Sequence, residues 1–230
     1  MLRNFGHKRH LIILGVCTLL LGIMVSVAAF ATSPSSASAA APANHHHDGD
    51  HDDDHAIAVV PFEFDPGHTD TVEASWVPGE GLTDQHGTKN EALLLTKLSK
   101  TSTNAASGAN VTNVKGITLT ELGFDVRSDG RCSAGAPQFN VVTSDGTTHI
   151  ADCAAATTTA TLTDPQGNTW LRKRFDLTSA STNVVPPITP GTKVKSISTI
   201  FHEGVDNGNG WTYLDNIDIN GTLIGQGAKG

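Results

Sequence analysis

Two short pairs, Asp145-Gly146 and Asn220-Gly221, most strongly constrain how this chain folds. Residues 139–143 and 147–150 flank the first pair, and residues 211–219 and 222–224 flank the second; all four segments are rich in β-branched and aromatic side chains. Asp-Gly and Asn-Gly adopt the positive φ angles that tight hairpin turns require. The sequence therefore predicts two β-hairpins.

Further strand signals continue this pattern. Residues 117–122, 124–127 and 194–201 are expected strands, and Pro-Gly clusters separate such segments. Residues 91–98 fit either a short helix or a buried strand. Many short strands with regular turns predict an all-β fold, a single β-sandwich of the jelly-roll type. A closed β-barrel is the alternative.

The N-terminus has the pattern of an export signal. A basic start is followed by residues 11–30 without a charge, and small-x-small sites follow at Ala29-Phe30-Ala31 and Ala37-Ser38-Ala39. We expect residues 1–31 to be a cleaved signal peptide, with a retained signal anchor as the alternative because the apolar run is long. In both cases the rest of the chain is extracellular or on the cell surface.

Residues 32–56 form an expected disordered linker. Its first part consists mainly of Ser, Ala and Pro, and its second part holds five His and five Asp without an apolar residue. Imidazoles bind transition metals, so the tract is either a solvated spacer or a weak, unselective metal-binding segment. Its candidate ligands are His45, His46, His47, His51 and His55. The folded domain is predicted to cover residues 57–230.

The charge of the chain makes two classes of partner less favoured. It has 23 acidic and 15 basic residues. Arg3, Lys8 and Arg9 precede the apolar run, so the part behind it carries 11 excess negative charges. This excess argues against nucleic acid and against docking on an anionic membrane. A membrane contact is expected only through an uncleaved N-terminal segment.

The exported part contains two cysteines, Cys132 and Cys153. An even pair in an oxidising compartment is most simply a disulfide. A closed loop of about twenty residues would stabilise the fold by roughly 3 kcal/mol in the chain-entropy model.

The last long strand carries an acid among apolar residues. Side chains alternate between the two faces of a strand, so one face should carry Trp211, Tyr213, Asp215, Ile217 and Ile219. A buried carboxylate needs hydrogen-bond donors or a cation. Three accounts stay open: backbone N–H donors, a bulge that turns Asp215 outward, and a structural Ca²⁺. Catalysis by Asp215 is the least favoured.

Residues 213–219, Tyr-Leu-Asp-Asn-Ile-Asp-Ile, resemble the closing strand of galactose-binding-like jelly rolls, including many carbohydrate-binding modules of secreted bacterial proteins. Pro61-Phe62-Glu63-Phe64 is similar to their opening strand. In several such families these two positions help to hold calcium, so the resemblance implies a calcium site at Glu63 and Asp215. The middle, residues 123–141, is similar to uncharacterised exported bacterial proteins and implies no activity.

A loop rich in Gly, Asn and Asp, residues 203–210, precedes the closing strand. It is either a solvated connection or part of a binding site on the rim of the domain. The candidate ligand-binding residues are Asp206, Asn207, Asn209 and the neighbouring Trp211. Large aromatic residues more often belong to a core than to a sugar-binding platform, which applies to Trp76, Trp170, Trp211 and Tyr213. Trp211, beside this loop, is the best candidate for a platform.

Three functions remain in view. We expect a non-catalytic surface or secreted binding module, with an extracellular glycan as the preferred ligand class and Ca²⁺ as the one candidate cofactor. A structural cell-envelope protein without a small ligand is the first alternative. A hydrolase acting on an extracellular polymer is the second, and the absence of an intact catalytic motif counts against it.

Overall fold

The computed structural model describes residues 56–83, 90–177, 183–201 and 210–225. All of them fall in one compact unit, Asp52–Gly230. The expected signal segment and the His/Asp tract with its five His lie outside the described residues. No helix among the described residues is long and apolar enough to cross a membrane.

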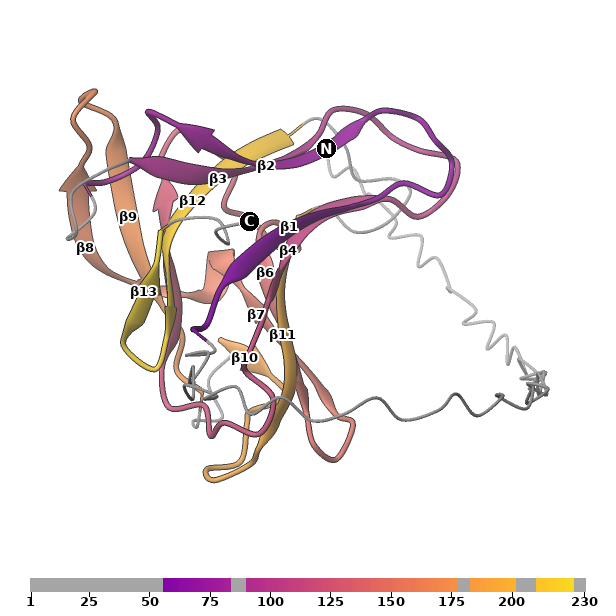
Figure 1. Cartoon of the computed structure of the whole chain (residues 1–230), viewed down its shortest axis with the longest axis vertical. Helices are drawn as coiled ribbons and strands as arrows, with labels where there is room; N and C mark the ends of the chain where they lie inside the picture. The colour runs from indigo at the N-terminus through magenta and orange to yellow at the C-terminus, as the bar shows by residue number, and fades with distance from the viewer. Residues whose placement is uncertain (1–55, 84–89, 178–182, 202–209, 226–230) are drawn as a thin grey trace, which may run out of the picture. The chain divides into compact units, whose positions relative to one another are not determined.

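The described chain is a β-sandwich of two antiparallel sheets, which confirms the predicted all-β fold (Figure 1). The first sheet has the order β1 (Val59–Phe64), β4 (Ala106–Val111), β11 (Val194–Phe201), β6 (Gln138–Thr143), β7 (Thr148–Asp152) and β10 (Val184–Val185). The second has the order β2 (Val72–Pro78), β3 (Glu91–Lys97), β12 (Gly210–Ile219), β5 (Leu122–Arg127), β9 (Thr169–Arg174) and β8 (Thr157–Thr163), with β13 (Thr222–Ile224) also paired to β12.

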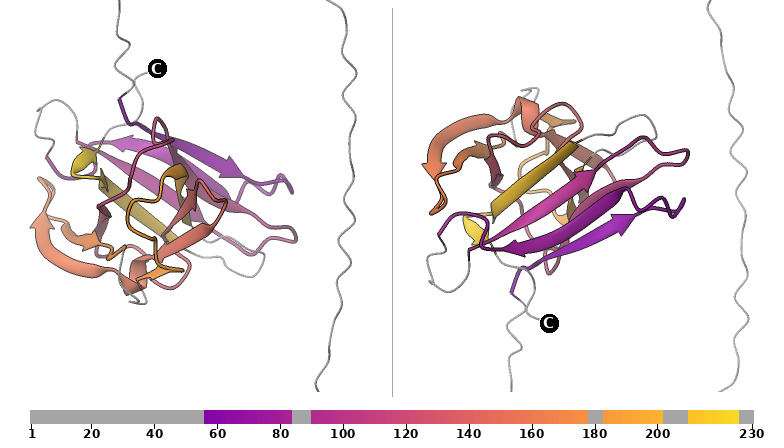
Figure 2. Two further views of the ribbon diagram at one scale, coloured as in Figure 1. Left: turned by 90° about the horizontal axis from the view of Figure 1, so that it is seen from below. Right: turned by 90° about the horizontal axis from the view of Figure 1, so that it is seen from above.

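The two edges of the second sheet are β2 and β8. Figure 2 shows the purple strands of the chain start and the orange strands β8 and β9 on opposite sides of the domain. The closing strand β12 lies in the middle of the second sheet, between β3 and β5. Residues far apart in sequence therefore meet on its faces.

Apolar side chains from both sheets form the core. Phe124 of β5, Phe139 of β6 and Phe175, which follows β9, pack with ring centroids 5.3–5.7 Å apart. Tilted and edge-on contacts at these distances are favourable for aromatic pairs. The core thus joins the two sheets through aromatic contacts.

Both predicted hairpins are present. Asp145-Gly146 connects β6 to β7, and Asn220-Gly221 connects β12 to β13. Asn220 and Gly221 have φ angles of 55° and 82°, as a tight hairpin turn requires. The predicted disulfide Cys132–Cys153 is also confirmed. Its Cys153 is fully buried and begins the 3₁₀ turn Cys153–Ala155.

Two strand predictions are decided by the structure. Residues 91–97 form the strand β3, not a helix. The strand predicted for residues 117–122 is wrong, because β5 begins at Leu122 and Thr118 makes only an isolated bridge. The side chain of Asn220 replaces a partner strand there: its amide oxygen accepts the N–H groups of Thr120 and Glu121, and its nitrogen donates to the Thr118 carbonyl.

Candidate functional site

The outer face of the second sheet carries rows of side chains that the strand register aligns. Ser75, Leu94 and Tyr213 form one row across β2, β3 and β12. Glu73, Thr96 and Trp211 form the next row. The alternate residues of β3, such as Leu93 and Leu95, belong to the core, so these two rows face away from it.

Two partly exposed aromatic side chains stand on this face. Trp211 and Tyr213 pack edge to face, with ring centroids 5.7 Å apart. The guanidinium carbon of Arg127 lies 4.1 Å from the Tyr213 ring centroid and 4.9 Å from that of Trp211. Both distances are typical of cation–π contacts. Burial and then the Glu80 carboxylate raise the pKa of Tyr213.

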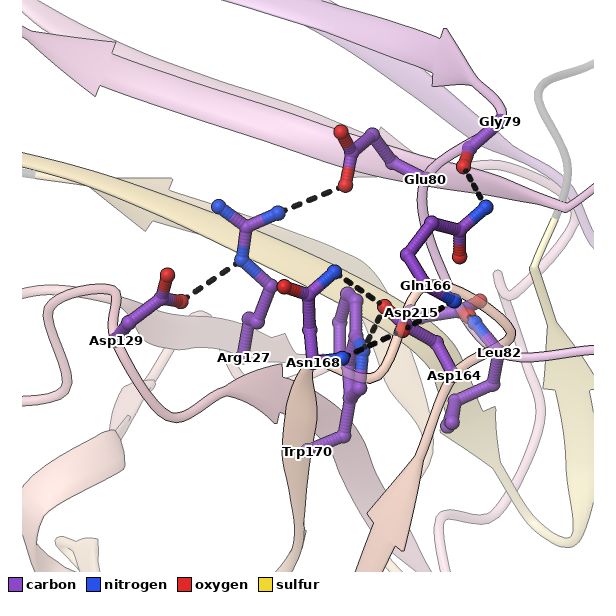
Figure 3. A network of polar contacts seen from close by, with 10 residues as sticks. All are labelled: Gly79, Glu80, Leu82, Arg127, Asp129, Asp164, Gln166, Asn168, Trp170 and Asp215. Carbon is purple, nitrogen blue, oxygen red and sulfur yellow. Dashed lines mark hydrogen bonds and ion pairs between the residues drawn. The ribbon is translucent and has the colours of Figure 1, made fainter.

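Arg127 is itself held by two carboxylates. Its Nη1 donates to Glu80 and its Nε donates to Asp129, both at 2.8 Å, as Figure 3 shows. The Arg127 side chain is only 12% exposed. A planar guanidinium fixed by two carboxylates has little rotational freedom left. The two rings therefore pack against a preorganised cation.

The segment 79–82 is fastened over the same face (Figure 3). The Gly79 carbonyl accepts from the side-chain amide of Gln166, and the N–H of Leu82 donates to Asp215 at 2.6 Å. Leu82 also packs with Ala92 and the fully buried Trp170 in a small apolar cluster. These contacts, together with the Glu80–Arg127 ion pair, hold the segment in place.

Asp164 organises the turn between β8 and β9. It accepts from Trp170 Nε1 at 2.9 Å, from the side-chain amide and backbone N–H of Asn168, and from the backbone N–H of Gln166. Burial on its own raises the pKa of Asp164, but these hydrogen bonds outweigh it and the pKa is lowered. The turn that holds Gln166 is therefore rigid and favours an ionised Asp164.

A bulge in β12 corrects the predicted alternation along this strand. The register with β5 shifts between Asp215 and Asp218, and Asn216 has a φ of 45°. Asp215 consequently stays on the outer face with the two aromatic residues, whereas Ile217 and Ile219 turn into the core. The expectation that all five residues share one face is wrong because an extra residue in one strand reverses the alternation behind it.

The carboxylate of Asp215 is satisfied by backbone donors. It accepts the N–H groups of Leu82 and Asn216, each at 2.6 Å. Glu63 instead accepts the N–H of Ala74 on the edge strand β2. β12 lies two strands in from β2, and its residue at the level of Ala74 is Thr212, three residues before Asp215, so the two carboxylates contact different strands at different levels of the sheet. Calcium ligands lie about 2.3–2.6 Å from the ion, so the structure does not bring Glu63 and Asp215 into one site.

Within the described ranges, no three His, Cys, Asp or Glu side chains are grouped in a way that could hold a metal ion. A calcium role for Asp215 stays a prediction.

A pocket of about 440 Å³ lies at the edge strand β2. Thr96 and Glu73, which lie in the same row as Trp211, contribute to its lining. The connection between β1 and β2 supplies Asp65, His68 and Asp70. Two residues of the pocket lining thus share a row with Trp211, which is not itself part of the lining.

The sequence identified only part of this arrangement. Trp211 lies at the site, whereas Asp206, Asn207 and Asn209 lie outside the described residues. Arg127 and Glu80 were missed, because their roles depend on the pairing of β5 with β12 and on the path of segment 79–82. The Arg-Ser-Asp sequence at 127–129 contained the only local signal, an arginine with a carboxylate two residues away.

No protein-family model, curated protein or solved structure matches this chain. The resemblance to galactose-binding-like jelly rolls therefore stays an expectation, and the argument about function rests on the site alone.

Proposed function

We propose that the chain is an exported, non-catalytic binding module and that its ligand is an extracellular glycan. The observation that carries this proposal is the pair Trp211 and Tyr213, partly exposed on an outer sheet face and packed against Arg127. Sugar rings present apolar C–H faces that pack on aromatic rings, and their hydroxyls need polar partners nearby. The proposal includes a jelly-roll connectivity for the two sheets and a cell-surface or extracellular location.

The neighbours of the rings favour one position for a sugar. Arg127 belongs to β5 and occupies the β5 side of both rings. On the other side of β12, Trp211 lies beside Thr96 and then Glu73. Ser75 of the neighbouring row donates to Glu73 at 3.1 Å, so further polar groups lie beside this row. We place the sugar on the β3 side of Trp211, above this row.

Rigidity supports the same conclusion. Ligand binding costs less free energy when the site is already ordered. The ion pairs of Arg127 fix the rings, and the contacts of segment 79–82 fix Glu80. Aromatic side chains add contact area at low entropic cost because they have few rotatable bonds.

The two alternatives make different demands. A hydrolase would need a pair of acids that its substrate can reach, and Asp125 and Asp215, which face each other across β5 and β12, cannot be that pair because they expose no surface. A purely structural envelope protein does not require a partly exposed aromatic pair such as Trp211 and Tyr213, packed against the Arg127 guanidinium.

The test is a glycan array probed with the full chain after export. Trp211→Ala should abolish the signals, while Ile150→Ala, which removes a 41% exposed apolar side chain from the other sheet, should leave them unchanged. Circular dichroism of both variants checks that the fold is intact. An array without signals, or signals that both variants retain, would refute the proposal.

A further inference from the structure

The turn between β12 and β13, at the end of the yellow hairpin in Figure 1, consists of the pair Asn220-Gly221. In such a pair the glycine nitrogen can attack the side-chain amide carbon of the asparagine, because glycine has no side chain to hinder the approach. A bond forms between this nitrogen and the amide carbon, and the amide nitrogen leaves as ammonia with the proton of the attacking N–H. Water then opens the cyclic imide to aspartate or isoaspartate. The chain thus contains a pair that can deamidate without an enzyme.

The backbone of the turn keeps the two reacting atoms apart. Ile219 pairs with Thr222, so the loop has only two residues, and their φ angles are 55° and 82°. Positive φ angles at both positions define a type I′ turn. The first central residue of this turn, the mirror image of a type I turn, has a ψ of about +30°. This ψ places the Gly221 nitrogen almost opposite Cβ of Asn220 across the Cα–C bond, so the nitrogen cannot reach the amide carbon.

The side-chain amide of Asn220 is also anchored away from Gly221. Its oxygen accepts the N–H of Thr120 at 2.7 Å, the Thr120 hydroxyl at 3.0 Å and the N–H of Glu121 at 3.1 Å. Its nitrogen, the group that would leave as ammonia, donates to the Thr118 carbonyl at 2.9 Å. All these partners belong to the segment before β5. The amide therefore has to give up its hydrogen bonds to this segment before it can turn towards the Gly221 nitrogen.

The attacking nitrogen is held as well. The N–H of Gly221 donates to Oδ1 of Asp218 at 2.8 Å. Asp218 is only 2% exposed, and Nη2 of Arg174 donates to its Oδ2 at 2.8 Å. The carboxylate is therefore fixed in position by an ion pair, and it directs the Gly221 N–H away from the Asn220 amide.

We propose that Asn220 is a deamidation site that the folded domain silences, so that it reacts only in molecules whose β12–β13 hairpin has opened. This inference is independent of the proposed glycan function. The reaction makes opening a one-way step. Isoaspartate inserts a former side-chain carbon into the backbone, which a two-residue turn does not accommodate. Aspartate lacks the N–H that donates to Thr118 and adds a negative charge near Asp218 and Glu121, so the reacted hairpin closes less favourably.

The experiment follows deamidation of the full exported chain at mildly alkaline pH, once in native buffer and once in concentrated urea. Digestion and mass spectrometry quantify the amide and acid forms of the peptide that contains residue 220. Asn220 should react at least about tenfold more slowly in the native protein, because only the opened fraction reacts. The pairs Asn207-Gly208 and Asn209-Gly210 serve as an internal reference, since all three pairs should react at similar rates in urea.

Asp218→Ala and Asp218→Asn form a matched pair of variants. Both lose the charge that pairs with Arg174, but only the Ala variant loses the acceptor for the Gly221 N–H. Native Asp218→Ala should therefore deamidate several-fold faster than wild type, whereas Asp218→Asn should stay close to wild type. Thermal melts show whether each variant is folded, and the rates in urea should be the same for all three proteins.

Two results would overturn the proposal. The first is a native wild-type rate equal to the rate in urea, because the folded turn would then give no protection. The second is a native rate that falls in Asp218→Ala. In that case Asp218 would act as a base that takes the proton of the Gly221 N–H, and Asn220 would react within the folded turn.

Discussion

Asp125 and Asp215 lie directly opposite each other on β5 and β12, and neither side chain exposes any surface. Like charges in this position are destabilising, and burial adds to the cost. Asp125 is compensated by a bidentate ion pair with Arg172, at 2.9 and 3.0 Å, and by the side-chain amide of Asn216. The backbone N–H groups of Leu82 and Asn216 offset the cost of burying the Asp215 carboxylate by donating hydrogen bonds to it. The pair thus fastens segment 79–82 and the bulge of β12 to the sheet.

Asp215→Ala should destabilise the domain strongly. The substitution leaves the N–H groups of Leu82 and Asn216 without this acceptor, and we expect a loss of about 2–4 kcal/mol. Asp215→Asn keeps one acceptor oxygen and should lose clearly less. Urea unfolding of both variants measures the difference. Equal losses would show that the negative charge, and not the acceptor atoms, stabilises this site.

The same site predicts how the domain responds to calcium. Because backbone donors already satisfy Asp215, melting curves recorded with Ca²⁺ and with a chelator should coincide. The calcium hypothesis from the sequence predicts the opposite result. A lower melting temperature in chelator, absent in Asp215→Asn, would establish a structural ion that these contacts do not require.

Arg127→Met should loosen the aromatic pair more than it destabilises the fold. The variant keeps an unbranched apolar side chain but loses both ion pairs and the cation–π contacts with Trp211 and Tyr213. We expect about 1–2 kcal/mol lower stability, together with a changed tryptophan emission spectrum. Arg127→Lys retains the charge without the planar fork and should restore only part of the stability. Wild-type emission in the Met variant would contradict the packing described here.

Local turn chemistry made several elements of the fold predictable. Asn220-Gly221 can hardly occur between two strand-like segments without forming a hairpin, and the pairing of Cys132 with Cys153 needed only export and an even count. The strand β11 was also visible, because its residues are mostly β-branched or aromatic. The edge strand β8 gave no such signal, because its threonines leave both faces polar and mostly exposed.

The candidate site was less predictable because it depends on register. Nothing in the residues 215–218 shows that Asn216 adopts a positive φ and reverses the faces of the strand behind it. The partners of Trp211 come from β3 and β5, which lie more than eighty residues earlier in the chain. A period of two assigns a side chain to a face, but it does not identify the neighbours on that face.

Asn216 offers a direct test of the bulge. Asn216→Gly suits the φ of 45° but removes the amide that donates to Asp125, whereas Asn216→Ala loses the same amide and also strains the backbone. Gly should therefore be the more stable variant, by about 1 kcal/mol. Chemical denaturation of the two proteins gives the comparison. A more stable Ala variant would contradict the left-handed conformation.

Reduction of the disulfide should weaken the domain without changing its topology. Cys132 and Cys153 are 21 residues apart, and a loop of this length corresponds to about 3 kcal/mol. The double variant Cys132→Ser, Cys153→Ser should show this loss in urea. Mass spectrometry of the exported chain, alkylated before and after reduction, should detect the two thiols only after reduction. Thiols that react without reduction would exclude the bridge.

Two buried aspartates should give opposite pH dependences. Hydrogen bonds lower the folded pKa of Asp164 below its ordinary value of 3.8, although burial opposes them. Burial raises the pKa of Asp218 above 3.8, although Arg174 opposes it. Ionised Asp164 therefore stabilises the fold above pH 3.8, and this contribution disappears as the pH falls through its folded pKa. Ionised Asp218 costs stability above its folded pKa, and this cost disappears as the pH falls towards 3.8.

The variants Asp164→Asn and Asp218→Asn separate these two contributions. The free energy of unfolding of wild type minus that of Asp164→Asn should be largest near neutral pH and should shrink in acid, because only the wild type loses an ionised carboxylate. The corresponding difference for Asp218→Asn should instead grow in favour of the wild type as the pH falls towards 3.8. Urea unfolding at a series of pH values gives both curves. Curves that run parallel would show that the donors around Asp164, from Trp170 and Asn168, do not favour its ionised form.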